Sequence, residues 1–231
     1  MATNYNTSII TDGLVLCLDA ANVKSYPGSG TTWTDLSGNS NNGTLVNSPT
    51  YLVTNNGSLV FNGTSDYISV PSSTALNPTT AITIESWVKF STTGTRIIWC
   101  GKGDGVSNPT TQYWMEKTVA DKIMIYLSFG ASAPNVTLKN TTIVAGIWYH
   151  IVATYDGATI KGYVNGVIDP TTYSYSGTLT TTSTIFSIGR LGTYNGLYMN
   201  GNVSGIKIYN TALSADEVLQ NFNATRGRYG I

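Results

Sequence analysis

Charged side chains are scarce in this 231-residue chain. They make up 10% of it, against roughly 25% in an average soluble protein, and 12 basic residues balance 12 acidic ones. Apart from Arg226 and Arg228 near the C-terminal end, no Lys/Arg cluster is present. Nucleic-acid-binding proteins carry a basic patch, so we expect no nucleic-acid partner. Low net charge also gives little repulsion between copies, which favours self-assembly or docking on a larger body.

Long apolar runs and a leader-like segment are also lacking. Residues 1–6 have neither a basic nor an apolar region, so we expect no signal peptide. No apolar run approaches the ~18 residues of a membrane span, so we expect no membrane partner. The two cysteines, Cys17 and Cys100, lie in apolar runs. We expect buried free thiols, and a disulfide between them is the alternative.

Strand patterns and turn residues fill most of the chain. Ile82–Phe90 alternates apolar and polar residues over nine positions, which is typical of a half-buried strand. Asp156–Gly157 and Asn165–Gly166 separate such runs, and both dipeptides favour tight hairpins because type I′ turns need positive φ. Further strand patterns lie at residues 14–19, 58–63, 66–70, 96–100, 113–116, 122–127, 148–155, 159–164, 184–189 and 201–209.

One segment, Ser214–Phe222, has a helical pattern instead. Ser214 is a natural N-cap, and Glu217 three residues later completes a capping box. Closely spaced strands without helices between them predict an all-β sandwich or barrel. We find no linker and no repeat, so we expect residues 1–231 to form one domain.

Five segments carry a family resemblance. They are FNGTSDYI (61–68), ITIESWV (82–88), WYHIVATYDG (148–157), YVNG (163–166) and GIKIYNTALSADEV (205–218). In this order they resemble the laminin-G-like and pentraxin-like branch of the concanavalin-A-type jelly roll, over a core of about residues 12–222. The resemblance implies an antiparallel jelly-roll sandwich of two sheets with one short C-terminal helix.

The opening segments 12–22, 26–33 and 35–39 are similar to laminin-G-like proteins of tailed bacteriophages. That similarity implies a non-catalytic structural or adhesive protein on the virion surface: a capsid decoration, fibre or tail component. Such a protein is made in the host bacterial cytoplasm and contacts other virion proteins or its own copies as a homo-oligomer. The alternative is a carbohydrate-binding lectin that recognises cell-surface glycan, with or without calcium.

Because this fold also hosts glycoside hydrolases, we tested the sequence for catalytic groups. Retaining glycosidases need two carboxylates about 5–5.5 Å apart, and the enzymes of this fold place them in an E-x-D-x-E run. None of the three glutamates, Glu85, Glu116 and Glu217, belongs to such a run. His150, the single histidine, lies within a strand pattern and is interpreted as structural. We therefore predict that the protein is not an enzyme, with glycoside hydrolysis as the remote alternative.

Candidate calcium ligands are few. Pentraxin-like calcium sites need an acidic cluster after the strand that corresponds to Ile185–Ile188, and Gly189–Gly196 has an arginine there and no carboxylate. Asp104, with Asn108, remains as a rim candidate for calcium, and a turn role for Asp104 is the alternative. We interpret Asp35 and Asp66 as turn residues too. No cofactor is required, and calcium stays an open option.

Glycan binding would use aromatic platforms and planar polar groups. The candidates for ligand binding are Tyr113, Trp114, Arg190, Tyr194 and Asn195. Trp114 lies in an alternating run, so a core position is its alternative. Tyr173 and Tyr175 share one strand face and serve equally well as an assembly contact, since tyrosine is enriched in interfaces.

Overall fold

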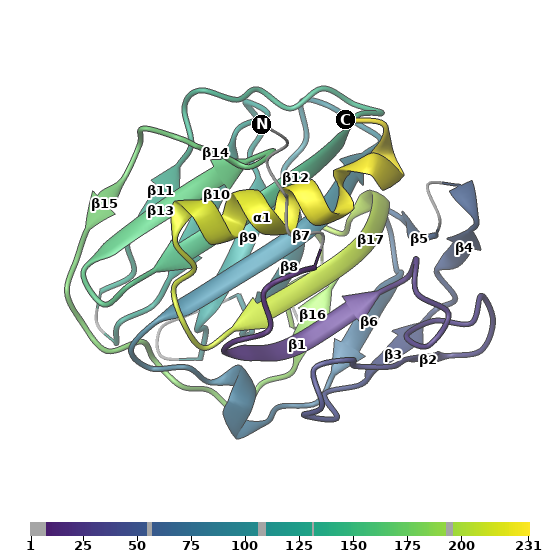
Figure 1. The fold of residues 1–231 in the computed structure, drawn as a ribbon, viewed down its shortest axis with the longest axis horizontal. Coiled ribbons are helices and arrows are strands. Elements are labelled where there is room, and N and C mark those ends of the chain that lie inside the picture. The colour runs from purple at the N-terminus through teal and green to yellow at the C-terminus, as the bar shows by residue number, and fades with distance from the viewer. Residues whose placement is uncertain (1–7, 55–56, 106–109, 131, 193–195) are drawn as a thin grey trace, which may run out of the picture.

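A computed structural model describes residues 8–54, 57–105, 110–130, 132–192 and 196–231. Two antiparallel sheets pack face to face as a jelly roll, and one short α-helix near the C-terminal end lies on one of them (Figure 1). We name the two layers sheet A and sheet B. The predicted fold class is confirmed.

Sheet A has nine strands among the described residues, with β14-β13-β12-β7-β17-β5-β4 in order, β1 beside β17 and β15 beside β13. Their bounds are β1 Leu14–Asp19, β4 Thr50–Leu52, β5 Ser58–Asn62, β7 Ile82–Phe90, β12 Trp148–Tyr155, β13 Thr159–Val164, β14 Val167–Ile168, β15 Tyr173–Ser174 and β17 Asn200–Tyr209.

Sheet B has eight strands in that same part of the chain, in the order β11-β10-β9-β8-β16-β6-β3-β2. Their bounds are β2 Thr32–Trp33, β3 Gly43–Val46, β6 Tyr67–Val70, β8 Ile97–Lys102, β9 Tyr113–Lys117, β10 Ile123–Leu127, β11 Asn135–Thr137 and β16 Phe186–Ile188. The helices are η2 Thr74–Leu76, α1 Ala215–Thr225 and η3 Arg226–Tyr229.

The core lies between the two sheets and follows from the alternation of the strands. Side chains at every second position point inward, and large buried residues such as Phe61, Phe90 and Trp99 meet there. The indole Nε1 of Trp99, from sheet B, donates to Ser86 Oγ of sheet A at 3.1 Å. The buried indole therefore has a hydrogen-bond acceptor, which removes the cost of an unpaired donor.

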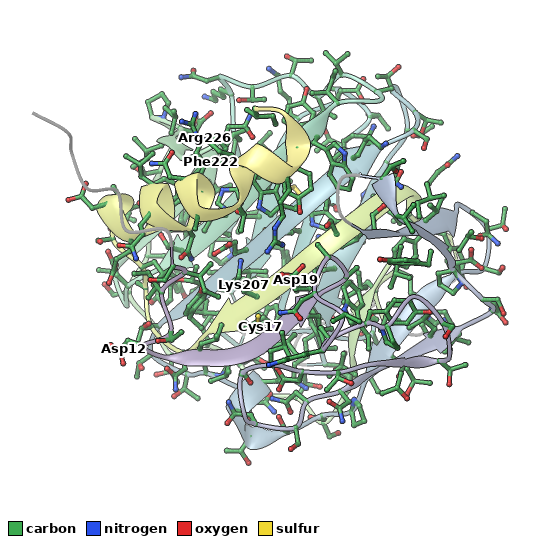
Figure 2. The ribbon with its side chains drawn as sticks, turned by 45° about the vertical axis from the view of Figure 1, so that its right-hand side comes forward. Asp12, Cys17, Asp19, Lys207, Phe222 and Arg226 are labelled. Atoms are coloured by element: carbon green, nitrogen blue, oxygen red, sulfur yellow. The ribbon has the colours of Figure 1, made fainter. Side chains whose placement is uncertain are left out.

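Both cysteines are buried and free, as expected. Cys100 belongs to the core cluster on β8. Cys17 lies on β1 of sheet A opposite Lys207 of β17, on the side of α1 (Figure 2). The two thiols therefore belong to different sheets and different layers of packing.

The turn between β13 and β14 confirms the hairpin prediction. Asn165 has φ 52° and Gly166 has φ 77°, the positive pair that a type I′ turn requires. A side chain at Gly166 would also meet Phe222 of α1, because an added Cβ would lie 2.9 Å from that ring.

Helix α1 begins at the predicted capping box: Ser214 Oγ accepts from Glu217 N, and Ser214 N donates to Glu217 Oε2. The helix and η3 cover the outer face of sheet A (Figures 1 and 2). Trp87 of β7 stacks on Tyr229 with ring centroids 3.9 Å apart and donates to Thr225 Oγ1 at 2.9 Å. No helix among the described residues lies on the outer face of sheet B, so that face is where a ligand can reach strand side chains.

Candidate functional site

The open face of sheet B carries an aromatic pair on neighbouring strands. Trp114 of β9 lies opposite Tyr126 of β10 in the antiparallel register. Their rings stack with centroids 3.5 Å apart and planes 8° apart, and both side chains are half-buried. Stacked rings restrain each other, so Tyr126 fixes one face of the indole.

An ion pair restrains the same indole from a second direction. Glu116, two residues along β9 and on the same sheet face, accepts a hydrogen bond from Trp114 Nε1 at 3.1 Å. It also accepts from Arg96 Nε at 3.1 Å and Arg96 Nη2 at 2.7 Å. The Glu116 side chain is 3% exposed and that of Arg96 is 41% exposed. Arg96 therefore presents a guanidinium of fixed orientation at the surface.

A hollow lies on the other side of Trp114, toward β8. It encloses about 250 Å³, counting space open to solvent, and is lined by Arg96, Ile98, Gly105, Trp114, Leu191 and Leu197. We name it the Trp114 hollow. Tyr126 of β10 stacks on one face of the Trp114 indole. The opposite face points toward β8, where Ile98 lies, and forms one wall of the hollow.

Gly101 makes this packing possible. An added Cβ at Gly101 would lie 2.6 Å from both Leu191 Cδ1 and Trp114 Cβ, so a larger residue would displace one wall of the hollow. The segment after β16 is held over the sheet by Ser187, whose Oγ accepts from Gly192 N at 2.8 Å and donates to Arg190 O at 3.2 Å.

The structure separates the predicted ligand residues. Trp114 faces the open side of sheet B. Tyr113 does not, because neighbouring strand residues point to opposite faces: its ring is in the core, and its hydroxyl donates to Leu76 O at 3.2 Å. The prediction that Tyr113 contacts a ligand is therefore wrong. Tyr194 and Asn195 lie outside the described residues.

Arg190 lies on the outer side of sheet B but does not line the Trp114 hollow, whereas its neighbour Leu191 does. The guanidinium carbon of Arg190 lies 3.5 Å from the ring centroid of Tyr67 on β6. This cation–π contact gives Arg190 a packing role, and its part in ligand binding stays a prediction.

The acidic residues singled out in turns accept hydrogen bonds from their own turn or from an adjacent strand. Asp35 accepts from Cys17 N at 2.8 Å and from Ser37 N at 2.9 Å. Asp66 accepts from Asn62 N at 3.1 Å. Both turn interpretations are confirmed. Asp104 accepts from Thr111 Oγ1 at 3.2 Å.

Among the described residues, no cluster of candidate metal ligands supports the calcium prediction. Asn108, the partner expected for Asp104, lies outside the described residues. Across the part of the chain that the structure describes, no group of three or more His, Cys, Asp or Glu side chains gathers. Calcium binding at Asp104 stays a prediction.

The other glutamates and the histidine lie away from the open face. Glu85 lies on the α1 side of sheet A, 1% exposed, and accepts from Lys207 Nζ and Asn221 Nδ2, both at 2.6 Å. His150 Nε2 lies 3.2 Å from Glu85 Oε1 without hydrogen-bond geometry. Burial alone would raise the pKa of Glu85, but the Lys207 ammonium and His150 outweigh it and hold that pKa below its ordinary value.

The sequence patterns did not single out five of the site residues: Arg96, Glu116, Tyr126, Leu191 and Leu197. For Tyr126 and Glu116 a signal existed, since both continue the alternation that places Trp114 outward. For Arg96, Leu191 and Leu197 there was none, because they reach the hollow from loops that only the tertiary fold brings together.

The architecture defines a jelly-roll domain with one open sheet, and the family comparison agrees. Residues 62–219 match the laminin G family described as the Concanavalin A-like lectin/glucanases superfamily. The chain belongs to that superfamily. No curated protein sequence matches it, and no helix among its described residues is long and apolar enough to cross a lipid bilayer.

Solved structures share the fold at low sequence identity. The binding domain of Paraclostridial Mosquitocidal Protein 1 is 17% identical with a TM-score of 0.74, over 93% of this chain and 52% of that one. Domain 4 of AbnA, a GH43 arabinanase from Geobacillus stearothermophilus in complex with arabinotriose, is 20% identical with a TM-score of 0.67, over 90% and 97%.

A third structure is the receptor-binding domain of a botulinum neurotoxin C/D mosaic serotype, 12% identical with a TM-score of 0.72 over 92% of this chain and 51% of that one. This chain thus spans about half of the two toxin domains and nearly all of the arabinanase domain. At these identities the likeness concerns the fold.

Proposed function

We propose that the protein is a carbohydrate-binding module whose ligand lies against the Trp114 hollow. One observation carries the proposal: an indole wall, held on its far face by Tyr126 and at its Nε1 by Glu116, borders an open hollow beside an oriented guanidinium. A sugar presents apolar C–H groups on its ring faces and hydroxyls at its edge. An aromatic face and a neighbouring guanidinium complement these two features.

The comparisons support the same class of ligand. The superfamily is named for lectins and glucanases, and the AbnA domain was solved with arabinotriose. One botulinum neurotoxin structure of the same fold concerns interaction with two ganglioside molecules, at 11% identity and a TM-score of 0.69. These proteins motivate glycans as the first ligands to test.

We further propose binding without catalysis. None of the described residues that line the hollow carries a carboxylate, and the nearby Glu116 is shared by Arg96 and Trp114. A glycosidase needs a second carboxyl group within reach of the scissile bond. A sensitive reducing-sugar assay on each bound glycan would contradict this proposal if it detected turnover.

A glycan array tests the proposed function, and Trp114→Ala tests the site. We expect the native protein to bind at least one glycan class and Trp114→Ala to lose about tenfold or more in affinity, because it removes an aromatic wall. Tyr173→Ala is the matched control, since Tyr173 is 43% exposed on β15 of the other sheet. Absence of any glycan binding, or equal loss in both variants, would contradict the proposal.

The opening segments support a second proposal, which concerns where the protein is located: it is a tailed-phage virion component that uses this module for adhesion. The reason for this proposal is that these segments resemble phage laminin-G-like proteins. In this chain the segments include β1 and the loop in which Asp35 accepts hydrogen bonds. Mass spectrometry of purified phage particles tests this location. Absence of the protein from the particles would contradict the location and would not affect the proposal of glycan binding.

A further inference from the structure

We propose that the site takes at least two consecutive sugar residues of a linear glycan, one in the Trp114 hollow and the next in an adjoining polar hollow, with Arg96 between them. This inference rests on the proposed function and names its ligand class more narrowly. It assigns Thr92, Thr95 and Asn200, which no sequence pattern singled out, to ligand binding.

The second hollow shares two walls with the first. Arg96 and Leu197 line both, and the second hollow is also lined by Gly63, Thr92, Thr95, Ile97, Tyr198 and Asn200. It encloses about 490 Å³, counting space open to solvent. The two hollows therefore adjoin each other at Arg96 and Leu197.

The linings differ in chemistry. The Trp114 hollow offers an indole face and the aliphatic side chains of Ile98, Leu191 and Leu197. The second hollow has Ile97 and Tyr198 in its lining and adds hydroxyls and an amide, with one hydrogen bond of 3.0 Å between Thr92 Oγ1 and Thr95 Oγ1. Apolar and aromatic contacts are available in both hollows, and the second adds hydroxyl and amide groups, so a monosaccharide would use only part of the site.

The shared wall is strained. Leu197 has φ 58°, a left-handed conformation that bulky residues rarely adopt. Its carbonyl is held by Ile98 N at 3.1 Å, and the nearby Asn200 O accepts from Ser91 N at 2.9 Å. Strained residues of this kind persist where the surroundings fix them, and they cluster at ligand sites.

The ion pair with Glu116 fixes the position from which Arg96 contacts both sugar residues. Glu116 binds Nε and Nη2 of Arg96, so the guanidinium plane is fixed at the boundary between the hollows. A lysine at this position would keep the charge and lose the planar fork. We therefore expect Arg96→Lys to weaken two-residue ligands.

The experiment is an array that carries the one-, two- and three-residue members of each saccharide series, followed by titration calorimetry on the series that binds. We expect two-residue ligands to bind about tenfold or more tighter than one-residue ligands of the same series. Thr92→Val and Asn200→Ala should weaken two-residue ligands by about threefold or more and leave one-residue ligands unchanged. Trp114→Ala should weaken both.

Thr92 lies in a loop outside the strands, and Thr172→Val, in the exposed loop before β15, is the matched control for Thr92→Val. One- and two-residue ligands of equal affinity, or second-hollow variants without effect, would overturn this inference while the proposed function stands. No binding by any series would overturn the proposed function and the inference with it.

Discussion

Glu85 is a buried carboxylate that three partners surround beneath helix α1. Replacing it with glutamine leaves the Lys207 ammonium, 10% exposed, without its counter-charge. Breaking a buried pair in this way costs about 3–5 kcal/mol. We expect Glu85→Gln to lower the free energy of unfolding by that order in urea denaturation. Glu217→Gln is the control: the capping box accepts either residue, so a loss below about 0.5 kcal/mol is expected.

The same residue predicts a pH dependence. The pKa of Glu85 is held below its ordinary value of 4.5 in the folded protein. The stability that it contributes is therefore fully present above pH 4.5 and is lost as the pH falls through the lower folded pKa. We expect the native protein to lose stability more steeply than Glu85→Gln between neutral pH and pH 3. Parallel pH profiles of the two proteins would contradict this assignment.

At the scale of elements, η3 attaches the chain end to sheet A. Tyr229 stacks on Trp87, and its hydroxyl donates to Ser204 Oγ at 2.8 Å. We expect Tyr229→Ala to lower the free energy of unfolding by about 3 kcal/mol, the usual cost of truncating a buried aromatic residue, and to shift Trp fluorescence to the red as Trp87 meets water.

Tyr173→Ala, at an exposed tyrosine of β15, is the control for this prediction and should change stability by less than about 0.5 kcal/mol. A Tyr229→Ala protein as stable as this control would show that η3 contributes little to the fold.

The long elements could be predicted from the sequence because their patterns are local. Ile82–Phe90, Trp148–Tyr155 and Thr159–Val164 have the predicted bounds, and Ser214 caps the helix as expected. The short strands β2, β4 and β14 were not predicted. They have two or three residues each, too few for an alternation, and exist because a longer neighbour offers its edge.

At the scale of the whole molecule, the sequence predicted the jelly roll but not which sheet stays open. That depends on where α1 packs, and the contacts that fix it join residues far apart in the sequence, such as Trp87 and Thr225, which are 138 positions apart. Trp114, a ligand candidate for which a core position was the alternative, is half-buried on the open face, and its ligand role stays a prediction, whereas Tyr113 lies in the core. Adjacent strand residues cannot share a face, so the alternation already contained that answer.

The balance of charge over the whole chain predicts how the site responds to its medium. With 12 basic and 12 acidic residues, long-range attraction of a charged ligand is weak, and Arg96 is already paired with Glu116. Stacking on Trp114 and short hydrogen bonds are insensitive to screening. We therefore expect glycan affinity to change by less than about twofold between low salt and about 0.5 M salt.

EDTA, which removes metal ions, should also leave glycan affinity unchanged. The side chains that line the hollow are an indole, aliphatic groups and a guanidinium, and a guanidinium repels cations. Calorimetric titrations across salt concentration, with and without EDTA, measure both effects. A steep fall of affinity with salt would indicate an anionic glycan bound mainly through Arg96. Loss of binding in EDTA that added calcium restores would place the ligand at a metal-dependent site instead, and the rim around Asp104 would then be the first place to mutate.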